Sequence, residues 1–467
     1  MQNTLPADTH PTVTEFIKRK TPTETIRIGF TDQKVSGRAG RSAFARFLHW
    51  HQLSALLAKA LPHRPTRPNA LPPEDLARGC IAGLLAGAQK LAHVAHLRGE
   101  PGLPALRGIK RVGSQSTFSR FFQGFDRAPG NTASLGHLGR WCLERVAGWP
   151  GGYSLELDSP RLLHEDGPQE GVAAGDTRLG IKPGRHLLLA GLAEAKLVVG
   201  FWLRAGNSVG ANNVGACIRE LLERLPHHLR RRVVRADSGF GEAGWLDFLE
   251  ERQLKCLVVA RLLRPLQTLL QQQTWTPPSV PGTPTAAVWH QEIHGPRPRR
   301  MILIRHPTAE RLARGQRPGG KPLFDGPGYP YQAWVTNFSE ATAALELGRD
   351  YNQRAGGEEV SQQRDHDFAL PHLWARQFWG TAAALSLAVF SYNLCPLFQR
   401  RLGWWERVTA ATLRFRLFIT GGIISRRGGR TTLRRRVPQK ERPWWVAICT
   451  KLQSTLPHGD AVGQPPG

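Results

Sequence analysis

The segment RRVVRADSGF, residues 231–240, contains the pattern on which the predicted fold depends. Its first six residues, with two adjacent valines, are typical of a strand, and the strand ends at Asp237. An earlier segment, GYSLELDSP at 152–160, has the same form and ends at Asp158. Because a carboxylate at a strand end points into a crevice rather than into the core, the two aspartates are candidates for one polar site.

The residues around the two aspartates predict an alternation of strands and helices. The predicted strands are 153–157, 186–192, 197–204, 231–236 and 255–261, and the predicted helices are 214–225 and 245–252. Three successive strands followed by alternating helices and strands indicate an α/β protein whose mixed sheet is covered by helices. Residues 263–336 add strand candidates at 286–293, 300–304 and 331–337, which predict a β-rich insertion, and helix returns from Ala341.

A third acidic residue would complete a metal site with the two aspartates. Carboxylates on neighbouring strands repel each other unless a cation lies between them, and Mg²⁺ prefers such oxygen ligands. The segment DYNQRAGGEEVSQQRD at 350–365 offers Glu358 as the third ligand. On a helix, Tyr351, Arg354 and Glu358 would share one face, with Arg354 holding a phosphate and Tyr351 positioning the strand. The alternative is that the aspartates are strand-end caps and that Glu358 lies on a solvated helix face.

The charge balance favours a polyanionic partner. The chain of 467 residues has 63 Lys and Arg against 36 Asp and Glu, a formal net charge of +27, and nucleic acid is the usual partner of such a chain. A hydrophobic fraction of 40% with 14 tryptophans excludes disorder throughout. The six cysteines form no CxxC pair and are predicted to be buried free thiols in a reducing compartment.

Residues 1–148 are predicted to be a flexible arm followed by helices. The segment GIKRVGSQSTFSRFFQGF at 108–125 predicts a short helix from Ser114 to Phe122, capped by the serine. The candidate DNA contacts on it are Gln115, Ser116, Thr117 and Arg120. A polar, basic helix after a tight turn suits the helix-turn-helix that enters a major groove, and an ordinary surface helix of an all-α domain is the alternative.

Two further segments need an assignment. Residues 378–398 carry no charge and are long enough to span a bilayer, yet they contain several polar residues and Pro396. A core helix is the favoured interpretation and a membrane-spanning helix the alternative. The basic run SRRGGRTTLRRR, within the tail at 421–467, is predicted to be mobile. The N-terminal segment has no apolar core, so no signal peptide is predicted.

Taken together, these motifs resemble those of the DDE transposases of bacterial insertion sequences, most closely the branch with a YREK signature (insertion-sequence family thirteen-eighty). The resemblance covers roughly residues 100–400, and Tyr351, Arg354 and Glu358 fit its Tyr-x2-Arg-x3-Glu motif. The other similar segments are SQSTFSRF at 114–121, LELDSP at 155–160, GPQEG at 167–171, KPGRHLLLAGLAE and WLRAGN within 182–207, RADSGF at 235–240, and WVTNF at 334–338. The lysine of the family would fall on Asp365, and the neighbouring Arg364 is the candidate to replace it.

The resemblance implies a ribonuclease-H-like mixed sheet with a β-rich insertion, preceded by an all-α N-terminal domain. The implied divisions are a helical DNA-binding region at 1–148, core segments at 149–262 and 337–420 on either side of the insertion at 263–336, and a basic tail at 421–467. It also implies that Asp158, Asp237 and Glu358 hold two Mg²⁺ ions, for which Mn²⁺ can substitute. The implied activity is Mg²⁺-dependent cleavage and strand transfer of insertion-sequence ends in cut-and-paste transposition.

The implied partners are double-stranded DNA with terminal inverted repeats, target DNA and a second copy of the chain on that DNA, with no membrane. The implied location is the bacterial cytoplasm, in association with the nucleoid. One alternative is a catalytically decayed copy that only binds DNA, because Asp365 replaces a cation and Gly356 and Gly357 weaken the helix before Glu358. A junction resolvase on the same fold and a basic structural protein are further alternatives.

Overall fold

The structure is a computed structural model. It describes residues 31–61, 67–100, 109, 111–125, 134–164, 169–177, 180–208, 213–241, 243–260, 264–275, 284–291, 298–306, 331–353, 368, 375–404, 408–428 and 430–452. Four residues of the predicted site region lie outside this part of the chain: Arg354, Glu358, Arg364 and Asp365.

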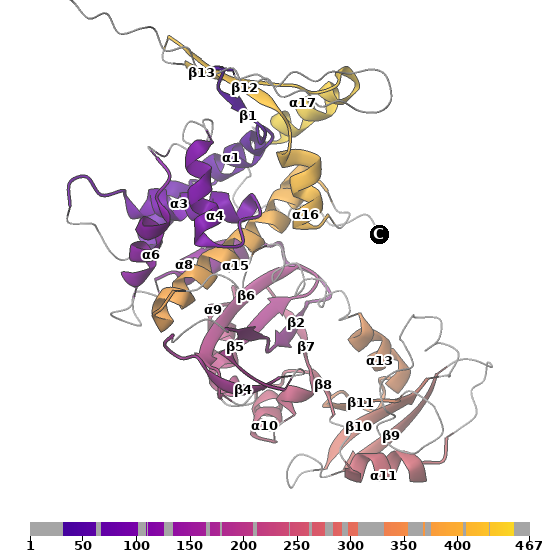
Figure 1. Ribbon diagram of the computed structural model, residues 1–467. Helices are drawn as coiled ribbons and strands as arrows, with labels where there is room; N and C mark the ends of the chain where they lie inside the picture. The colour runs from indigo at the N-terminus through magenta and orange to yellow at the C-terminus, as the bar shows by residue number, and fades with distance from the viewer. Residues whose placement is uncertain are drawn as a thin grey trace, which may run out of the picture.

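A mixed sheet forms the centre of the molecule (Figure 1). Its central strands are β2 (Tyr153–Asp158), β5 (Gly180–Leu192), β6 (Leu197–Ala205), β7 (Arg231–Ala236) and β8 (Cys256–Val259). They lie in the order β6-β5-β2-β7-β8. Strands β2, β7 and β8 are parallel, whereas β5 is antiparallel to both β2 and β6. All five predicted strands are therefore present, and the prediction of a mixed α/β fold is confirmed.

The predicted insertion is rich in strands, and these strands continue the same sheet. Strand β11 (Tyr331–Thr336) pairs antiparallel with β8 and is followed across the sheet by β10 (Arg299–Arg305) and β9 (Thr285–Gln291). Short strands β3 (Arg161–Leu163) and β4 (Ala173–Thr177) pair with β5 near the other edge. In the described residues the sheet therefore has ten strands.

The two faces of the sheet bury different apolar clusters, because alternate side chains of a strand point to opposite faces. Val233 packs with Trp334 and Leu347 under α13 (Ala344–Asn352). Val234 belongs to the main core on the opposite face. The helices that follow the central strands and contribute to that core are α9 (Val214–Arg224), α10 (Ala243–Glu251) and α11 (Arg264–Gln272).

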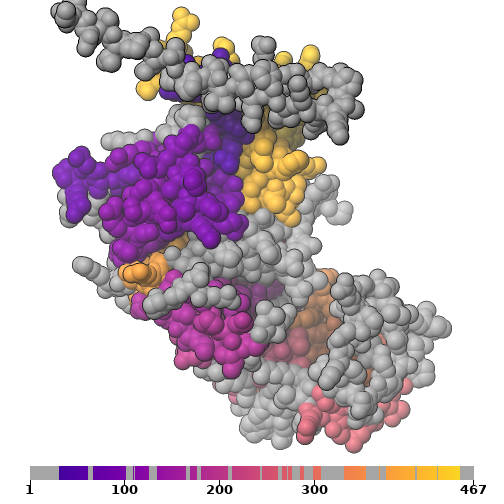
Figure 2. All heavy atoms as spheres, viewed as in Figure 1, coloured from indigo at the N-terminus to yellow at the C-terminus, as the bar shows by residue number. Residues whose placement is uncertain are grey.

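The N-terminal helices pack around a long helix from the C-terminal part of the chain. They are α1 (Arg41–Trp50), α2 (Leu53–Ala60), α3 (Pro73–Leu85), α4 (Leu91–His96), α6 (Gln115–Gln123) and α8 (Gly136–Leu143). The long helix is α15 (Phe378–Leu402), which contacts α3, α6, α8 and β6. The N-terminal and C-terminal parts thus lie together at one end of the molecule (Figure 2). The proposed domain boundaries stay predictions.

Helix α15 is long and apolar enough to cross a membrane by length and composition, but 89% of its most apolar window is buried inside the protein. The side chain of Asn393 accepts a hydrogen bond from the backbone N–H of Val198 at 2.8 Å and donates to the carbonyl of Val198 at 2.9 Å. This pairing joins the helix to strand β6. The burial agrees with the favoured interpretation of a core helix.

The prediction that the basic tail is mobile was wrong for residues 422–427, 430–435 and 442–451, which have regular secondary structure. These residues form β12 (Gly422–Arg427), β13 (Arg430–Arg435) and α17 (Arg442–Lys451), and β12 also pairs with β1 (Val35–Ser36). In the described part of residues 1–148, β1 is the one strand and the other elements are helices. The physical reason is that isoleucines and threonines flank a Gly-Gly pair, a combination that favours a β-hairpin despite the surrounding charge.

Candidate active site

Asp158 and Asp237 lie at the same edge of the sheet. Strands β2 and β7 are parallel neighbours, with Glu156 opposite Arg235. Continuing this register by two residues brings Asp158 opposite Asp237, on strands that lie about 4.8 Å apart. Both aspartates are half-buried. The structure therefore brings together two of the three acids that the sequence singled out.

Backbone N–H groups orient both carboxylates. One oxygen of Asp158 accepts a hydrogen bond from the N–H of Ser159 at 2.9 Å, and one oxygen of Asp237 accepts from the N–H of Gly239 at 2.8 Å. A Cβ atom added to Gly239 would lie 3.0 Å from that same oxygen of Asp237. The glycine of the RADSGF segment therefore allows the backbone to approach the carboxylate closely.

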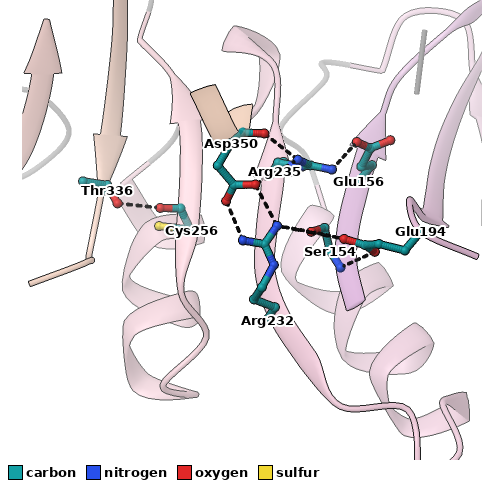
Figure 3. Close-up of polar contacts among 8 residues, drawn as sticks. All are labelled: Ser154, Glu156, Glu194, Arg232, Arg235, Cys256, Thr336 and Asp350. Atoms are coloured by element: carbon teal, nitrogen blue, oxygen red, sulfur yellow. Dashed lines mark hydrogen bonds and ion pairs between the residues drawn. The ribbon is translucent and has the colours of Figure 1, made fainter. Parts of the chain in front are cut away.

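A network of ion pairs and hydrogen bonds joins residues of β2 and β7 that precede the two aspartates, and Figure 3 shows its members. The guanidinium of Arg235 donates to a carboxylate oxygen of Glu156 at 2.8 Å and to the backbone carbonyl of Asp350 at 2.6 Å. The Arg235 side chain is 2% exposed and that of Glu156 is 13% exposed. Arg232 donates to both carboxylate oxygens of Asp350 at 2.7 Å and to the hydroxyl of Ser154 at 2.7 Å. The network ties strands β2 and β7 to helix α13.

Tyr351 fastens the end of α13 beside the second aspartate. Its hydroxyl donates to the carbonyl of Ala236 at 3.3 Å, and its ring lies 5.5 Å from the ring of Trp334 between centroids. Ala236 immediately precedes Asp237, so the helix ends next to the carboxyl end of β7. The segment that contains Arg354 and Glu358 begins two residues after the helix, outside the described residues.

A buried polar cluster next to Asp158 was missed by sequence reasoning. One ring nitrogen of His186 forms a hydrogen bond with the hydroxyl of Ser159 at 2.6 Å, and the other donates a hydrogen bond to the carbonyl of Ser208 at 2.9 Å. Arg204 donates to the same Ser159 hydroxyl at 3.3 Å. Burial lowers the pKa of His186, and the nearby charge of Arg204 lowers it further. In the sequence, His186 appeared only as the first residue of a predicted strand.

The carboxylates of Asp158 and Asp237 suit a hard cation, and the predicted third ligand, Glu358, lies outside the described residues. Carboxylate oxygens are the ligands that Mg²⁺ prefers, and Asp158 and Asp237 place two carboxylates on adjacent strands. Within the described ranges, no group of three or more His, Cys, Asp or Glu residues is placed to hold a metal ion.

Helix α6 has the form that the sequence predicted for the candidate DNA-contacting helix. The hydroxyl of Ser114 accepts from the N–H of Thr117 at 3.2 Å and caps the helix. Gln115, Ser116 and Arg120 are exposed, whereas Thr117 is half-buried. The buried side is made of phenylalanines at 118, 121 and 122. The polar side of the helix is therefore exposed and available to a ligand.

Comparisons with known proteins complete these observations. The family model described as Transposase DDE domain group 1 matches residues 193–453, which is more than half of the chain. This match includes Asp237 and Glu358 and begins after Asp158. Among solved structures, the chain is similar to a piggyBac transposase synaptic complex with hairpin DNA, with 13% identity, a TM-score of 0.36, and coverage of 94% of this chain and 80% of that chain. No curated protein matches the chain.

Proposed function

Because the chain belongs to the family of group 1 transposase DDE domains, we propose that it catalyses Mg²⁺-dependent cleavage and strand transfer at the ends of an insertion sequence. The observation that carries this proposal is the register of β2 and β7, which brings Asp158 and Asp237 together at one edge of the sheet. The finer assignment to the YREK branch is part of the proposal and rests on the spacing of Tyr351, Arg354 and Glu358.

The proposed fold of the catalytic core is ribonuclease-H-like. Support comes from the strand order β6-β5-β2-β7-β8, in which three antiparallel strands in chain order are followed by two strands parallel to the first. In this arrangement the first and fourth strands of the core are neighbours. The aspartates at the ends of these two strands, β2 and β7, can then contribute to one catalytic site at a single phosphodiester.

The proposed metal ligands are Asp158, Asp237 and Glu358, which would hold two Mg²⁺ ions or two Mn²⁺ ions. When bound, such ions lower the pKa of a water or DNA 3′-hydroxyl and neutralise charge on the leaving oxygen. The protein residues supply the placement: Ser159 and Gly239 orient the two aspartates, and Tyr351 holds α13 at the same edge. Arg354 would bind a DNA phosphate, and Arg364 would take the place of the lysine of the family.

The proposed partners are DNA duplexes with terminal inverted repeats, a target DNA and a second copy of the chain, in the bacterial nucleoid. The net charge of +27 supports binding to DNA phosphates. We assign recognition of the repeat to the exposed side of α6, with Gln115, Ser116, Thr117 and Arg120 as the contacting residues.

The test is a cleavage assay with the full chain and a duplex that carries the inverted repeats bracketing its coding region. We expect strand cleavage in Mg²⁺ and in Mn²⁺, and none in EDTA. Asp158→Asn, Asp237→Asn and Glu358→Gln should each abolish cleavage without changing the thermal midpoint. Glu359→Gln is the matched control, because it removes the adjacent carboxylate and should leave cleavage unchanged.

A second assay separates the alternatives. Precut ends are incubated with a target plasmid, and joined products are counted. A junction resolvase would give no joined product, and a decayed copy would bind the repeats without cleaving them in either metal. If the three acidic variants behave like the unmodified chain in every assay, the protein is not a DDE enzyme.

A further inference from the structure

The hairpin of β12 and β13 forms a two-stranded ribbon at one end of the molecule (Figure 1). Strand β1 pairs only with Gly422 and Ile423 of β12, so the rest of the ribbon has two strands in the described part of the chain. Arg427 and Arg430 are the last pair before the turn, which leaves a two-residue Gly-Gly connection. Gly428 has a φ of 54°, a conformation that short hairpin connections require and that glycine adopts readily.

One face of the ribbon is held against α17. Ile424 is buried, and the guanidinium of Arg435 lies 4.0 Å from the ring centroid of Trp445. Arg435 also donates to the sulfur of Cys449 at 3.6 Å. These contacts fix the base of the ribbon, so its opposite face is presented in one orientation.

The opposite face is basic and exposed. The cross-strand pairs on it are Ile423 with Arg434, Ser425 with Thr432, and Arg427 with Arg430. All six of these side chains are exposed. Residues 421–452 contain seven arginines and two lysines against a single glutamate, Glu441. Among the described residues, no carboxylate forms an ion pair with Arg427, Arg430 or Arg434.

The pair of Arg427 and Arg430 is unfavourable for the isolated hairpin. Like charges directly opposite each other on neighbouring strands destabilise the pairing. An anion between or beside the two guanidinium groups would relieve this repulsion. The ribbon is therefore better suited to the complex with a polyanion than to the free protein.

We infer that this ribbon, on the face with Arg427, Arg430 and Arg434, binds in the major groove of a DNA duplex. The groove of B-form DNA accommodates a two-stranded β-ribbon, and closely spaced arginines can contact phosphates and guanine edges there. The groove of an A-form RNA duplex is too narrow for it. The inference builds on the proposed function, since it adds a DNA contact separate from both α6 and the aspartates.

The test measures duplex affinity by fluorescence anisotropy in EDTA, with Asp158→Asn in the background so that cleavage cannot interfere. The variant combines Arg427→Gln, Arg430→Gln and Arg434→Gln. The matched control combines Arg219→Gln, Arg252→Gln and Arg264→Gln, which removes the same charge from exposed positions on or next to α9, α10 and α11. Thermal unfolding of both proteins checks the fold.

We expect the ribbon variant to bind the duplex about tenfold more weakly or worse, and the control variant to bind like the parent. The slope of log affinity against log salt should fall by up to about 2.7 in the ribbon variant, because each phosphate that an arginine neutralises contributes about 0.9 to that slope. Equal affinities and slopes for the ribbon and control variants would overturn the inference. Equal binding of an RNA duplex would overturn the assignment to the major groove of DNA.

The design remains informative if the triple variant unfolds. The double variant Arg427→Gln with Arg430→Gln removes only the repelling pair at the tip, away from the packed base. It should stay folded and should still show most of the loss of affinity for the duplex. Because binding is measured without metal, a chain that never cleaves DNA can still support or overturn the ribbon. Failure of the proposed catalytic function and failure of this inference are therefore distinguishable.

Discussion

Arg235 and Glu156 form a 2.8 Å ion pair between two parallel strands, and each stands two residues before one of the paired aspartates. Side chains two residues apart on a strand share a face, so this ion pair lies directly behind Asp158 and Asp237. The guanidinium of Arg235 also donates to the backbone carbonyl of Asp350, so the pair connects both strands to α13. The pair therefore holds β2 and β7 together two residues before the edge at which the two aspartates lie.

Replacing Arg235 with methionine should destabilise the protein strongly. The substitution removes a guanidinium that is 2% exposed, together with its hydrogen bonds to Glu156 and to the carbonyl of Asp350, and breaking a buried pair in this way costs about 3 kcal/mol or more. Urea unfolding at neutral pH measures the loss. Arg140→Met is the control, because its pair with Glu144 is exposed, and such pairs contribute about 0.5 kcal/mol. Similar small losses for both variants would contradict the structural role of Arg235.

Tyr351→Phe should separate stability from activity. The variant keeps the ring on Trp334 and loses one long hydrogen bond, so the free energy of unfolding should fall by at most about 1 kcal/mol. If α13 positions Glu358, cleavage should fall about tenfold or more, because small displacements of reacting groups are costly. The measurement is the rate of cleavage at saturating DNA, compared between the variant and the unmodified chain.

The control for this prediction is Tyr153→Phe. The hydroxyl of Tyr153 also donates to a backbone carbonyl, that of Ala147, at 2.7 Å, but at the opposite end of strand β2. Tyr153→Phe should lose stability to an extent similar to that of Tyr351→Phe, and it should cleave DNA at the full rate. A Tyr351→Phe variant as active as this control would show that the bond to Ala236 has no role in placing the site.

Gly239→Ala tests whether the close approach at Asp237 matters. The added methyl group would stand 3.0 Å from the carboxylate oxygen, so either the carboxylate or the turn must shift. We expect a large loss of cleavage with a change in stability of no more than about 1 kcal/mol. Gly244→Ala is the control, since no atom lies within 4 Å of its added Cβ, and it should stabilise α10 by about 0.5 kcal/mol. Normal cleavage by Gly239→Ala would contradict the proposed orientation of Asp237.

The sequence was sufficient for the strands that carry the aspartates, because their apolar character is local and each ends at an acid. It also located the three strands of 263–336, but not their addition to β8, because pairing between distant segments leaves no local pattern. The ribbon at β12 and β13 was not predicted, because a dense run of arginines is also typical of a mobile basic tail and its hairpin residues are few. The contact of His186 with Ser159 depends on strand register, which no local motif specifies.

Helix α6 offers a test of its two interpretations. Ser114→Ala removes the N-cap and should cost about 1 kcal/mol of stability, with little effect on affinity for folded protein. Arg120→Ala should leave stability unchanged, because Arg120 is exposed. If α6 binds the terminal repeat, Arg120→Ala should weaken binding of the repeat, as measured by anisotropy with a duplex of unrelated sequence as reference. Unchanged binding would favour the ordinary surface helix.

The stability of the chain should depend on pH through His186. Burial and the charge of Arg204 lower the pKa of this histidine in the folded state below its ordinary value of 6.5. As the pH falls through 6.5, the unfolded chain takes up a proton at this position and the folded chain does not, so the contribution to stability is present above that pH and declines below it. His186→Gln loses the hydrogen bonds of the ring to Ser159 and Ser208, so it should be less stable than the parent at about pH 7.5. Because glutamine does not titrate, the variant keeps its stability as the pH falls while the parent loses some, and the difference should narrow toward about pH 5.5. Urea unfolding across this range measures the difference. A constant difference between His186→Gln and the parent would mean that the ring of His186 is protonated equally in both states, and that its bond to Ser159 does not depend on the neutral form.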